Sequence, residues 1–314
     1  MPWWRCTPRR RRPWPRSVTD HVPVLVAEVL ATLRPRPGGW YLDATVGLGG
    51  HAEAILRASE PTGMLLGIDR DGEALALASQ RLAPFGDRVI LVHGRYEGLA
   101  DLVEAGRQFD GILFDLGASS LHLDTAARGF SFGREGPLDM RMDQSVGETA
   151  ADLVGRLSEQ ELADLIFRWG EERRSRRIAR AIVEARRRSP IRTTTALAEV
   201  VARAIPRAAW PRHIHPATRT FQALRIAVND ELTGLGRGLE EAAGLLRPGG
   251  CIAAISFHSL EDRIVKQTWR RLGAAGGMRI LTKRPITPGE AEAAANPRAR
   301  SAKLRALLRV PEAA

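Results

Sequence analysis

The sequence predicts an α/β fold in which helices cover both faces of a parallel sheet. Short apolar segments, each long enough for one buried strand, alternate with segments whose apolar residues recur at helical spacing. Three of the apolar segments end at an aspartate, namely Asp43, Asp69 and Asp115. Aspartate is common where strands end, but ligands of parallel sheets also bind there, so the three acids favour one common ligand-binding edge.

The predicted elements follow in a regular order along the chain. A helix over 24–33 is ended by Pro35 and Pro37. Strands are expected at 40–43, 64–68, 89–93, 111–114 and 251–256, with helices around 74–78 and 263–272. Two β-like segments, 279–282 and 304–308, are expected to pair as the last two strands of the sheet.

The strand pattern is interrupted between 122 and 235. A polar loop over 122–143 comes first, and helical stripes then follow at 158–169, 178–185, 197–204 and 221–232. Ser158 and Glu161 form the capping box of the first of these helices. The sequence therefore predicts a sheet core over 18–121 and 236–314, an inserted helical domain over 122–235, and a disordered arm over 1–17.

The charge of the chain favours a polyanionic partner. The net charge is +11, and the first 17 residues contribute arginines but no acid. The arm either grips RNA or results from a start codon placed too far upstream. The chain contains no run of 18 apolar residues, so no membrane span is predicted. Its two cysteines do not indicate a disulfide framework, and we therefore expect a cytoplasmic protein.

A glycine-rich turn joins the strand over 40–43 to the following helix. Gly47, Gly49 and Gly50 permit positive φ and leave no Cβ between the main chain and a ligand. The helix after the turn presents free N–H groups to whatever lies above it. A nucleotide-like ligand is the resulting hypothesis, although such turns also occur without a ligand.

The acid before this turn distinguishes between two cofactor classes. A carboxylate at Asp69 can accept hydrogen bonds from both ribose hydroxyls of NAD or of S-adenosylmethionine. A carboxylate at Asp43 would repel a diphosphate but attract the cationic groups of S-adenosylmethionine. We therefore favour S-adenosylmethionine, with a nicotinamide-dependent oxidoreductase and a non-enzymatic RNA-binding or assembly factor as alternatives.

Other polar clusters give weaker indications. The arginines over 173–188 either contact RNA phosphates or form a solvated helix face. His213, His215 and His258 suggest no metal site, because no cysteine or acid completes a set at ligand spacing. Ser259 beside His258 lacks the Gly-x-Ser-x-Gly turn of a hydrolase, so we expect this loop to line the substrate pocket.

Several longer motifs resemble those of one family. They are 21–25, 43–45, 49–51, 114–120, 129–132, 136–143, 215–225 and 256–263. From about His21 to Val310 the chain resembles the ribosomal RNA small subunit methyltransferase H family, which comprises bacterial 16S rRNA cytosine-N4 methyltransferases.

The resemblance implies a class I (Rossmann-like) methyltransferase sheet with an inserted helical substrate-recognition domain. It also implies that the chain transfers a methyl group from S-adenosylmethionine to N4 of cytidine 1402 in the decoding region of 16S rRNA. Carried over by position, the cofactor contacts fall on Gly49, Gly50, His51, Asp69, Tyr96, Asp115 and His122. Tyr96 stands where Phe is usual, and His122 follows leucine where Pro-Gln is common.

The predicted chemistry depends mainly on positioning, because the lone pair on N4 is delocalised and must be aligned with the methyl–sulfur bond. Asp115, or a backbone carbonyl over 115–117, is the candidate acceptor for an N4–H. The target base must leave its stack to react. Phe130 or Phe132 could then stack on it, or could simply pack beneath the loop.

Overall fold

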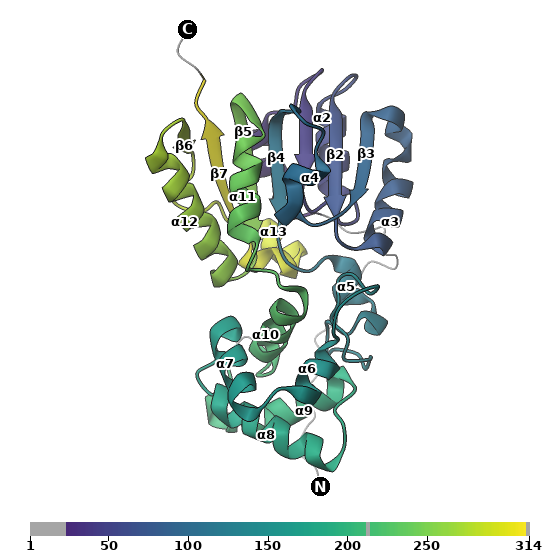
Figure 1. Cartoon of the computed structure of the whole chain (residues 1–314), viewed down its shortest axis with the longest axis vertical. Helices are drawn as coiled ribbons and strands as arrows, with labels where there is room; N and C mark the ends of the chain where they lie inside the picture. Colours follow the sequence, from purple (N-terminus) through teal and green to yellow (C-terminus); the bar gives the residue numbers. More distant parts are fainter. Residues whose placement is uncertain (1–22, 212–213, 312–314) are drawn as a thin grey trace.

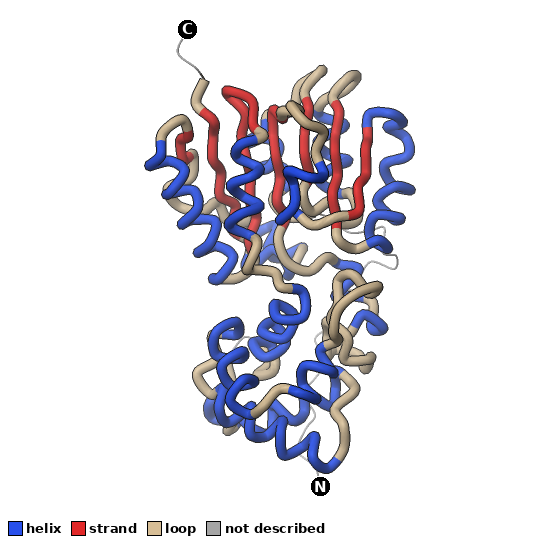
Figure 2. The backbone as a smooth tube through the Cα atoms, in the orientation of Figure 1, coloured by secondary structure: helices blue, strands red, loops and turns tan. Residues whose placement is uncertain are grey.

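The computed structural model describes residues 23–211 and 214–311. The predicted arm over 1–17 and His213 lie outside the described residues. Figure 1 shows two parts along the long axis of the molecule, a sheet part and a helical part beside the carboxyl ends of most of its strands. Figure 2 shows that the strands are confined to the sheet part.

The sheet has seven strands in the order β3-β2-β1-β4-β5-β7-β6. Their bounds are β1 Trp40–Asp43, β2 Met64–Asp69, β3 Val89–His93, β4 Phe109–Asp115, β5 Leu246–Ser256, β6 Met278–Ile280 and β7 Lys303–Arg309. Neighbouring strands among β1–β5 run parallel, whereas β7 is antiparallel to both β5 and β6. The predicted strands and the pairing of the last two are confirmed. The strand order reverses at β1 and β4, which is where parallel sheets bind ligands.

Helices cover both faces of the sheet, as the apolar strands require. One face packs on α1 (Val26–Leu33), α2 (Gly50–Ala58) and α3 (Gly72–Leu82). The other packs on α4 (Leu99–Leu102), α11 (Leu235–Gly244) and α12 (Ser259–Ala275). Side chains alternate between the faces, so that Leu65 belongs to the first core and Leu66 to the second.

The helical part lies between β4 and β5 in the chain. It contains α5 (Ser120–Asp124), α6 (Ala150–Arg156), α7 (Glu159–Gly170), α8 (Ser175–Arg188), α9 (Thr194–Ala204) and α10 (Thr218–Asn229). Helices α6–α10 share a hydrophobic core of their own, with Ile166, Ile178 and Leu224 at its centre. The predicted capping box is confirmed, because Ser158 caps α7 together with Glu161.

Helices α10 and α11 are two of those that differ from the prediction. The helix expected over 221–232 ends at Asn229, because Asp230 adopts a left-handed backbone with φ 49°. Helix α11 was not predicted, since glycines interrupt its apolar stripe. One of them, Gly238, is required by packing, because a Cβ there would lie 2.7 Å from the carbonyl oxygen of Tyr96. Among the described residues, no helix is both long and apolar enough to cross a membrane.

Two glycines allow the loop after α5 to fold back on itself. A Cβ at Gly136 would overlap the carbonyl oxygen of Ala126. Gly129 has φ +75°, and a Cβ there would overlap the carbonyl oxygen of Pro137. The clashing atoms belong to the backbone and cannot rotate away. Glycine is therefore needed at both positions.

We expect Gly136→Ala to lower the free energy of unfolding by about 1–3 kcal/mol, because the added methyl group forces two backbone segments apart. Urea denaturation measures this change. Gly155→Ala in α6 is the matched control, since its methyl group would meet no atom of the described residues within 4 Å outside its own stretch of helix. That variant should be neutral or slightly stabilising. Equal destabilisation of the two variants would contradict the packing explanation.

Candidate active site

A cavity of about 490 Å³ lies between the carboxyl ends of the strands and the helical part. This volume falls in the range of small-molecule sites. Its wall includes every predicted cofactor residue except Gly49: Gly50, His51, Asp69, Tyr96, Asp115 and His122. Gly49 is the N-cap residue of α2 in the adjoining turn. The sequence-predicted residues are therefore gathered at one site.

The turn after β1 owes its shape to its glycines. Gly47 and Gly49 have φ of +51° and +79°. A Cβ at Gly50 would overlap Pro23, so this glycine also permits close packing. The backbone N–H of Gly47 donates to Asp69 Oδ2 at 2.8 Å. The turn is thus tied directly to the acid at the end of β2.

Asp69 has acceptor capacity left toward the cavity. Its Oδ1 accepts from the backbone N–H of Asp71 at 2.9 Å, and its Oδ2 accepts from Gly47. Each carboxylate oxygen has two lone pairs, so each can accept a further hydrogen bond. Burial raises the pKa of Asp69. These properties suit a carboxylate that accepts from paired hydroxyls.

Asp115 and His51 form the acidic end of the cavity. His51 Nε2 lies 3.5 Å from Asp115 Oδ2. Asp115 Oδ1 is buried and has no hydrogen-bond partner in the described part of the chain, and neither has either ring nitrogen of His51. Burial lowers the pKa of His51, but the nearby Asp115 and Asp43 carboxyls outweigh it and raise that pKa. The site therefore holds polar atoms that a ligand could satisfy.

Asp43 occupies a different place from the one predicted. The prediction put its carboxylate against the ligand, whereas the structure buries it to 1% exposure beneath the turn, where it accepts from the backbone N–H of Thr45 at 3.2 Å. It is not among the described residues that line the cavity. Burial raises the pKa of Asp43 to about 7. Its charge can reach the cavity only at longer range, past His51.

We expect this burial to make stability depend on pH. Because the pKa of Asp43 is about 7 in the folded state and near 4 when exposed, the native state binds its proton more tightly over that interval. The free energy of unfolding should therefore fall as pH rises from 4 to 7, by at most about 1.4 kcal/mol per pH unit for this group.

Asp43→Asn should flatten the decline, as measured by urea denaturation at several pH values. The exposed Asp101→Asn is the control and should follow the parent protein. If the free energy of unfolding fell equally with pH in the parent and in Asp43→Asn, Asp43 would not be the cause of the decline.

Two aromatic rings form another wall of the cavity. Tyr96 donates its hydroxyl to the carbonyl oxygen of Glu231 at 2.9 Å, and its ring meets Phe114 edge-on. His122 stacks on Phe130, with ring centroids 4.7 Å apart. His122 Nδ1 accepts from the N–H of Ser119, so Nε2 carries the proton when the ring is neutral. Tyr96 and His122 thus offer ring surfaces whose polar atoms are already engaged.

A buried ion-pair network, not predicted from the sequence, fixes this wall. Asp71 Oδ2 accepts from His122 Nε2 at 2.7 Å and from Arg128 Nη2 at 2.9 Å. Arg128 also donates to the carbonyl oxygen of Met142 at 2.6 Å. Although burial raises the pKa of Asp71, hydrogen bonds and charge from His122 and Arg128 lower it overall. The network attaches the loop after α5 to the start of α3.

A second unpredicted cluster lies across the cavity. Arg225 donates two hydrogen bonds, each of 2.9 Å, to Glu231 and lies 3.9 Å from Glu261. His258 Nε2 lies 3.1 Å from Glu261 Oε1. Burial raises the pKa of Glu261, but His258 and Arg225 outweigh it and lower that pKa. The cluster joins the end of α10 to the start of α12.

The cluster differs from what the sequence predicted about metal ligands near His258. The sequence suggested that no acid completes a set with His258, yet Glu231 and Glu261 bring their ligand atoms within 4.8 Å of it and of one another. Arg225 already supplies the cationic charge between the two acids. His258 Nδ1 accepts from the N–H of Glu261, which leaves the proton of a neutral ring on Nε2. This protonation does not suit a metal ligand.

The phenylalanines of the loop both line the cavity but differ in exposure. Phe130 is 6% exposed, and one face of its ring is covered by His122. Phe132 is half-buried and contacts Phe221 and His215, with centroids 4.8 and 4.7 Å away. Phe132 is thus the more accessible of the two rings for stacking on a base.

Several known proteins are similar to this chain in sequence or in fold. Residues 18–310 match the profile of the MraW methylase family. A protein named ribosomal RNA small subunit methyltransferase H from Geobacter sulfurreducens is 56% identical over 304 residues, covering 91% of this chain and 98% of the relative. The protein of the same name from Syntrophotalea carbinolica is 52% identical over 314 residues, covering 94% and 99%. A solved structure of a putative rRNA methylase from Clostridium thermocellum covers 91% of this chain and 95% of its own, with 11% identity and a TM-score of 0.45.

Proposed function

We infer the function from one premise: the chain belongs to the MraW methylase family, that of ribosomal RNA small subunit methyltransferase H. It is an S-adenosylmethionine-dependent methyltransferase that acts on N4 of cytidine 1402 in 16S rRNA. The observation in the structure that carries this function is the acidic end of the cavity. There Asp115 Oδ1, at the carboxyl end of β4, is buried and has no hydrogen-bond partner among the described residues.

The residues of the cavity fit this cofactor. We propose that Asp69 accepts from the ribose hydroxyls, and that the turn containing Gly49 and Gly50 lets the ligand approach the backbone. The ring surfaces of Tyr96 and His122 would flank the adenine. Asp115 and His51 lie where hydrogen-bonding groups of the ligand would satisfy their unpaired atoms. The Asp115 carboxylate at this end also favours a cation over a diphosphate.

The proposed chemistry assigns one main task to Asp115. When bound, S-adenosylmethionine supplies a methyl group on a cationic sulfur. In the reaction, the N4 amine of cytosine would gain the methyl group and lose one proton, which Asp115 or solvent water would accept. An acceptor at Asp115 Oδ1 would orient an N4–H and raise the electron density on nitrogen before the transfer. Most of the rate enhancement would come from this positioning.

The substrate side of the cavity has walls suited to a flipped base. We propose that Phe132 stacks on the cytosine once it has left the rRNA stack. The cluster of Arg225, Glu231 and Glu261 would hold the end of α10 and the start of α12 at a fixed separation. We also propose residues 18–121 and 236–314 as the methyltransferase core, and 122–235 as the substrate-recognition domain. The proposed compartment is the cytoplasm, because the rRNA substrate lies there.

Mass spectrometry of small-subunit rRNA tests this function directly. Cells that lack the protein should lack N4-methylation at cytidine 1402, and the purified protein with S-adenosylmethionine should restore it. A thermal shift with NAD but none with S-adenosylmethionine would instead favour an oxidoreductase. Loss of cofactor binding without any change in RNA affinity or ribosome assembly would favour a non-enzymatic role.

A further inference from the structure

Helix α8 carries a one-sided array of arginines. Its buried residues are Ser175, Ile178, Ala179, Ile182 and Val183. At about 100° per residue, the opposite side of the helix holds the exposed side chains of Arg176, Arg177, Arg180, Arg187 and Arg188, which we call the arginine face. The only acid of the helix, Glu184, lies among them. The face is therefore strongly cationic over about 18 Å of helix.

Most of these arginines have no acidic partner among the described residues, unlike several exposed arginines elsewhere in the molecule. In the described part of the chain, the only ion pair of the arginine face is between Arg180 and Glu159, at 3.6 Å. By contrast, the exposed Arg57, Arg203 and Arg237 each pair with a glutamate four residues away. Like charges at helical spacing repel one another by a few tenths of a kcal/mol per pair. A polyanion on the face would relieve that repulsion.

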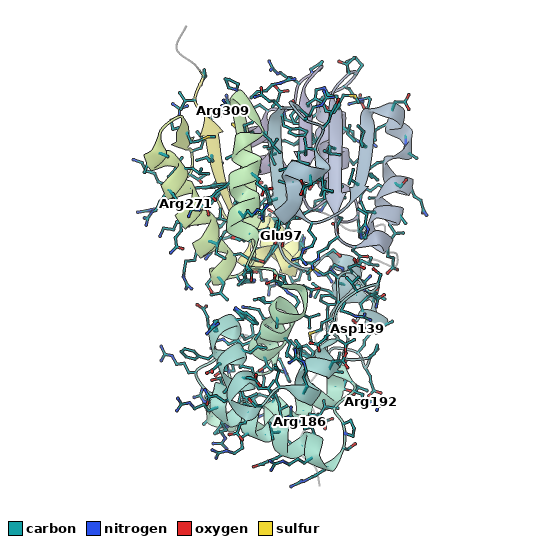
Figure 3. All side chains as sticks on the ribbon, viewed as in Figure 1. Glu97, Asp139, Arg186, Arg192, Arg271 and Arg309 are labelled. Atoms are coloured by element: carbon teal, nitrogen blue, oxygen red, sulfur yellow. The ribbon has the colours of Figure 1, made fainter. Side chains whose placement is uncertain are left out.

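The arginine face continues into a hollow between α6 and the end of α8. Four arginines line it, namely Arg156, Arg186, Arg187 and Arg192, together with the acids Glu148 and Asp152. Arg156 pairs with Glu148, and Arg186 donates to the carbonyl oxygen of Val154. Figure 3 shows Arg186 and Arg192 at the end of the helical part that lies away from the sheet. The cationic surface thus extends beyond one helix.

The first turn of α8 follows closely on a residue that lies near the cavity. Glu171, at the end of α7, accepts hydrogen bonds from Ser259 and from Arg263, which is 3.0 Å away on α12. Residues 257, 258 and 261 of the same segment line the cavity. From here the helix extends about 20 Å across the helical part. A strand lying along α8 would therefore lead toward the cavity.

We propose that the arginine face and the adjoining hollow bind the phosphate backbone of 16S rRNA on one side of the target cytidine. The inference rests on the proposed function, since it names the surface by which that substrate is held. Phosphates follow one another about every 3.4 Å along a strand of duplex, so five guanidinium groups over the length of α8 can meet several of them. Bidentate arginine–phosphate hydrogen bonds would fix the strand without reading its sequence.

The test compares salt dependence in two triple variants of the full chain. Binding of protein-free 16S rRNA is titrated at several KCl concentrations, and log K is plotted against log[KCl]. Replacing Arg176, Arg177 and Arg187 by glutamine should reduce the steepness of that slope by about 2 to 3. Affinity near 0.15 M salt should fall about 10- to 100-fold, while turnover at saturating RNA and affinity for S-adenosylmethionine stay unchanged.

The matched control replaces Arg57, Arg203 and Arg237, which are 65%, 80% and 71% exposed but ion-paired. The slope of log K against log[KCl] for this control should stay near that of the parent protein. A second control, with lysine at 176, 177 and 187, keeps the positive charges and should also preserve the slope. Equal slopes for the two glutamine triples would overturn the inference. So would weaker binding to whole small subunits with an unchanged slope on free rRNA, because the face would then bind a ribosomal protein. Absence of N4-methylcytidine with the parent protein would instead refute the proposed function, and the slopes would still decide the role of the arginine face.

Discussion

Asp115→Asn is expected to lower kcat by at least about 100-fold while leaving affinity for S-adenosylmethionine within about tenfold of the parent. The variant keeps the shape of the side chain, but the amide is a weaker acceptor than the carboxylate. It also removes the charge that lies 3.5 Å from His51 Nε2. The pKa of His51, which Asp115 helps to raise, should therefore fall. Single-turnover kinetics at saturating cofactor and RNA measure the chemical step.

Asp69→Asn separates catalysis from cofactor binding. Asp69 lies at the end of β2 and is tied to the glycine turn, so its loss should weaken cofactor binding more than it lowers kcat. If Asp115→Asn behaved like Asp69→Asn, with turnover restored at saturating cofactor, Asp115 would only hold the cofactor. Full turnover with unchanged cofactor affinity would exclude both roles for Asp115.

Arg128→Met is expected to destabilise the fold by about 3–5 kcal/mol, because it leaves the buried Asp71 carboxylate without its guanidinium partner. The loop that contains Phe130 and Phe132 should then detach from α3. Urea denaturation gives the stability change. Limited proteolysis in the loop gives an independent readout of its detachment.

An exposed ion pair provides the control for this prediction. Arg156 and Glu148 are 57% and 51% exposed, so Arg156→Met should leave stability close to that of the parent protein. The double variant Asp71→Asn with Arg128→Met should recover part of the loss, since it removes the unpaired charge. Additive losses in the double variant would show that the two side chains act independently.

The sheet was predictable because its signals are local. Apolar segments of strand length, separated by helical stripes, place β1–β5 near their observed bounds. The aspartates at the ends of β1, β2 and β4 were correctly expected to lie at one edge, since parallel strands share a direction. Asp43 was misplaced because the prediction considered only its position at the strand end. Side chains alternate along β1, so Asp43 points to the same face of the sheet as Tyr41 and is buried there.

The networks around the cavity could not be read from the sequence. Asp71 and Arg128 are 57 residues apart, and nothing in the local pattern indicates that this arginine is buried. Arg225 and Glu231 are only six residues apart, but their contact depends on α10 ending at Asn229, where the prediction extended the helix. The tertiary fold brings these charged side chains together. It also excludes the water that would otherwise weaken the attraction between them.

The position of the helical part in the chain has a consequence for folding. Strands β4 and β5 are direct neighbours in the sheet, yet Asp110 and Arg247 at their paired ends are 137 residues apart. The entropy cost of closing so long a loop falls if the segment between has already collapsed around its own core. During synthesis the helical part can therefore fold before the sheet is complete, while β1–β4 wait for β5. Arg298 and Ser301 also line the cavity, so a growing chain cannot form the whole site until those residues have been added.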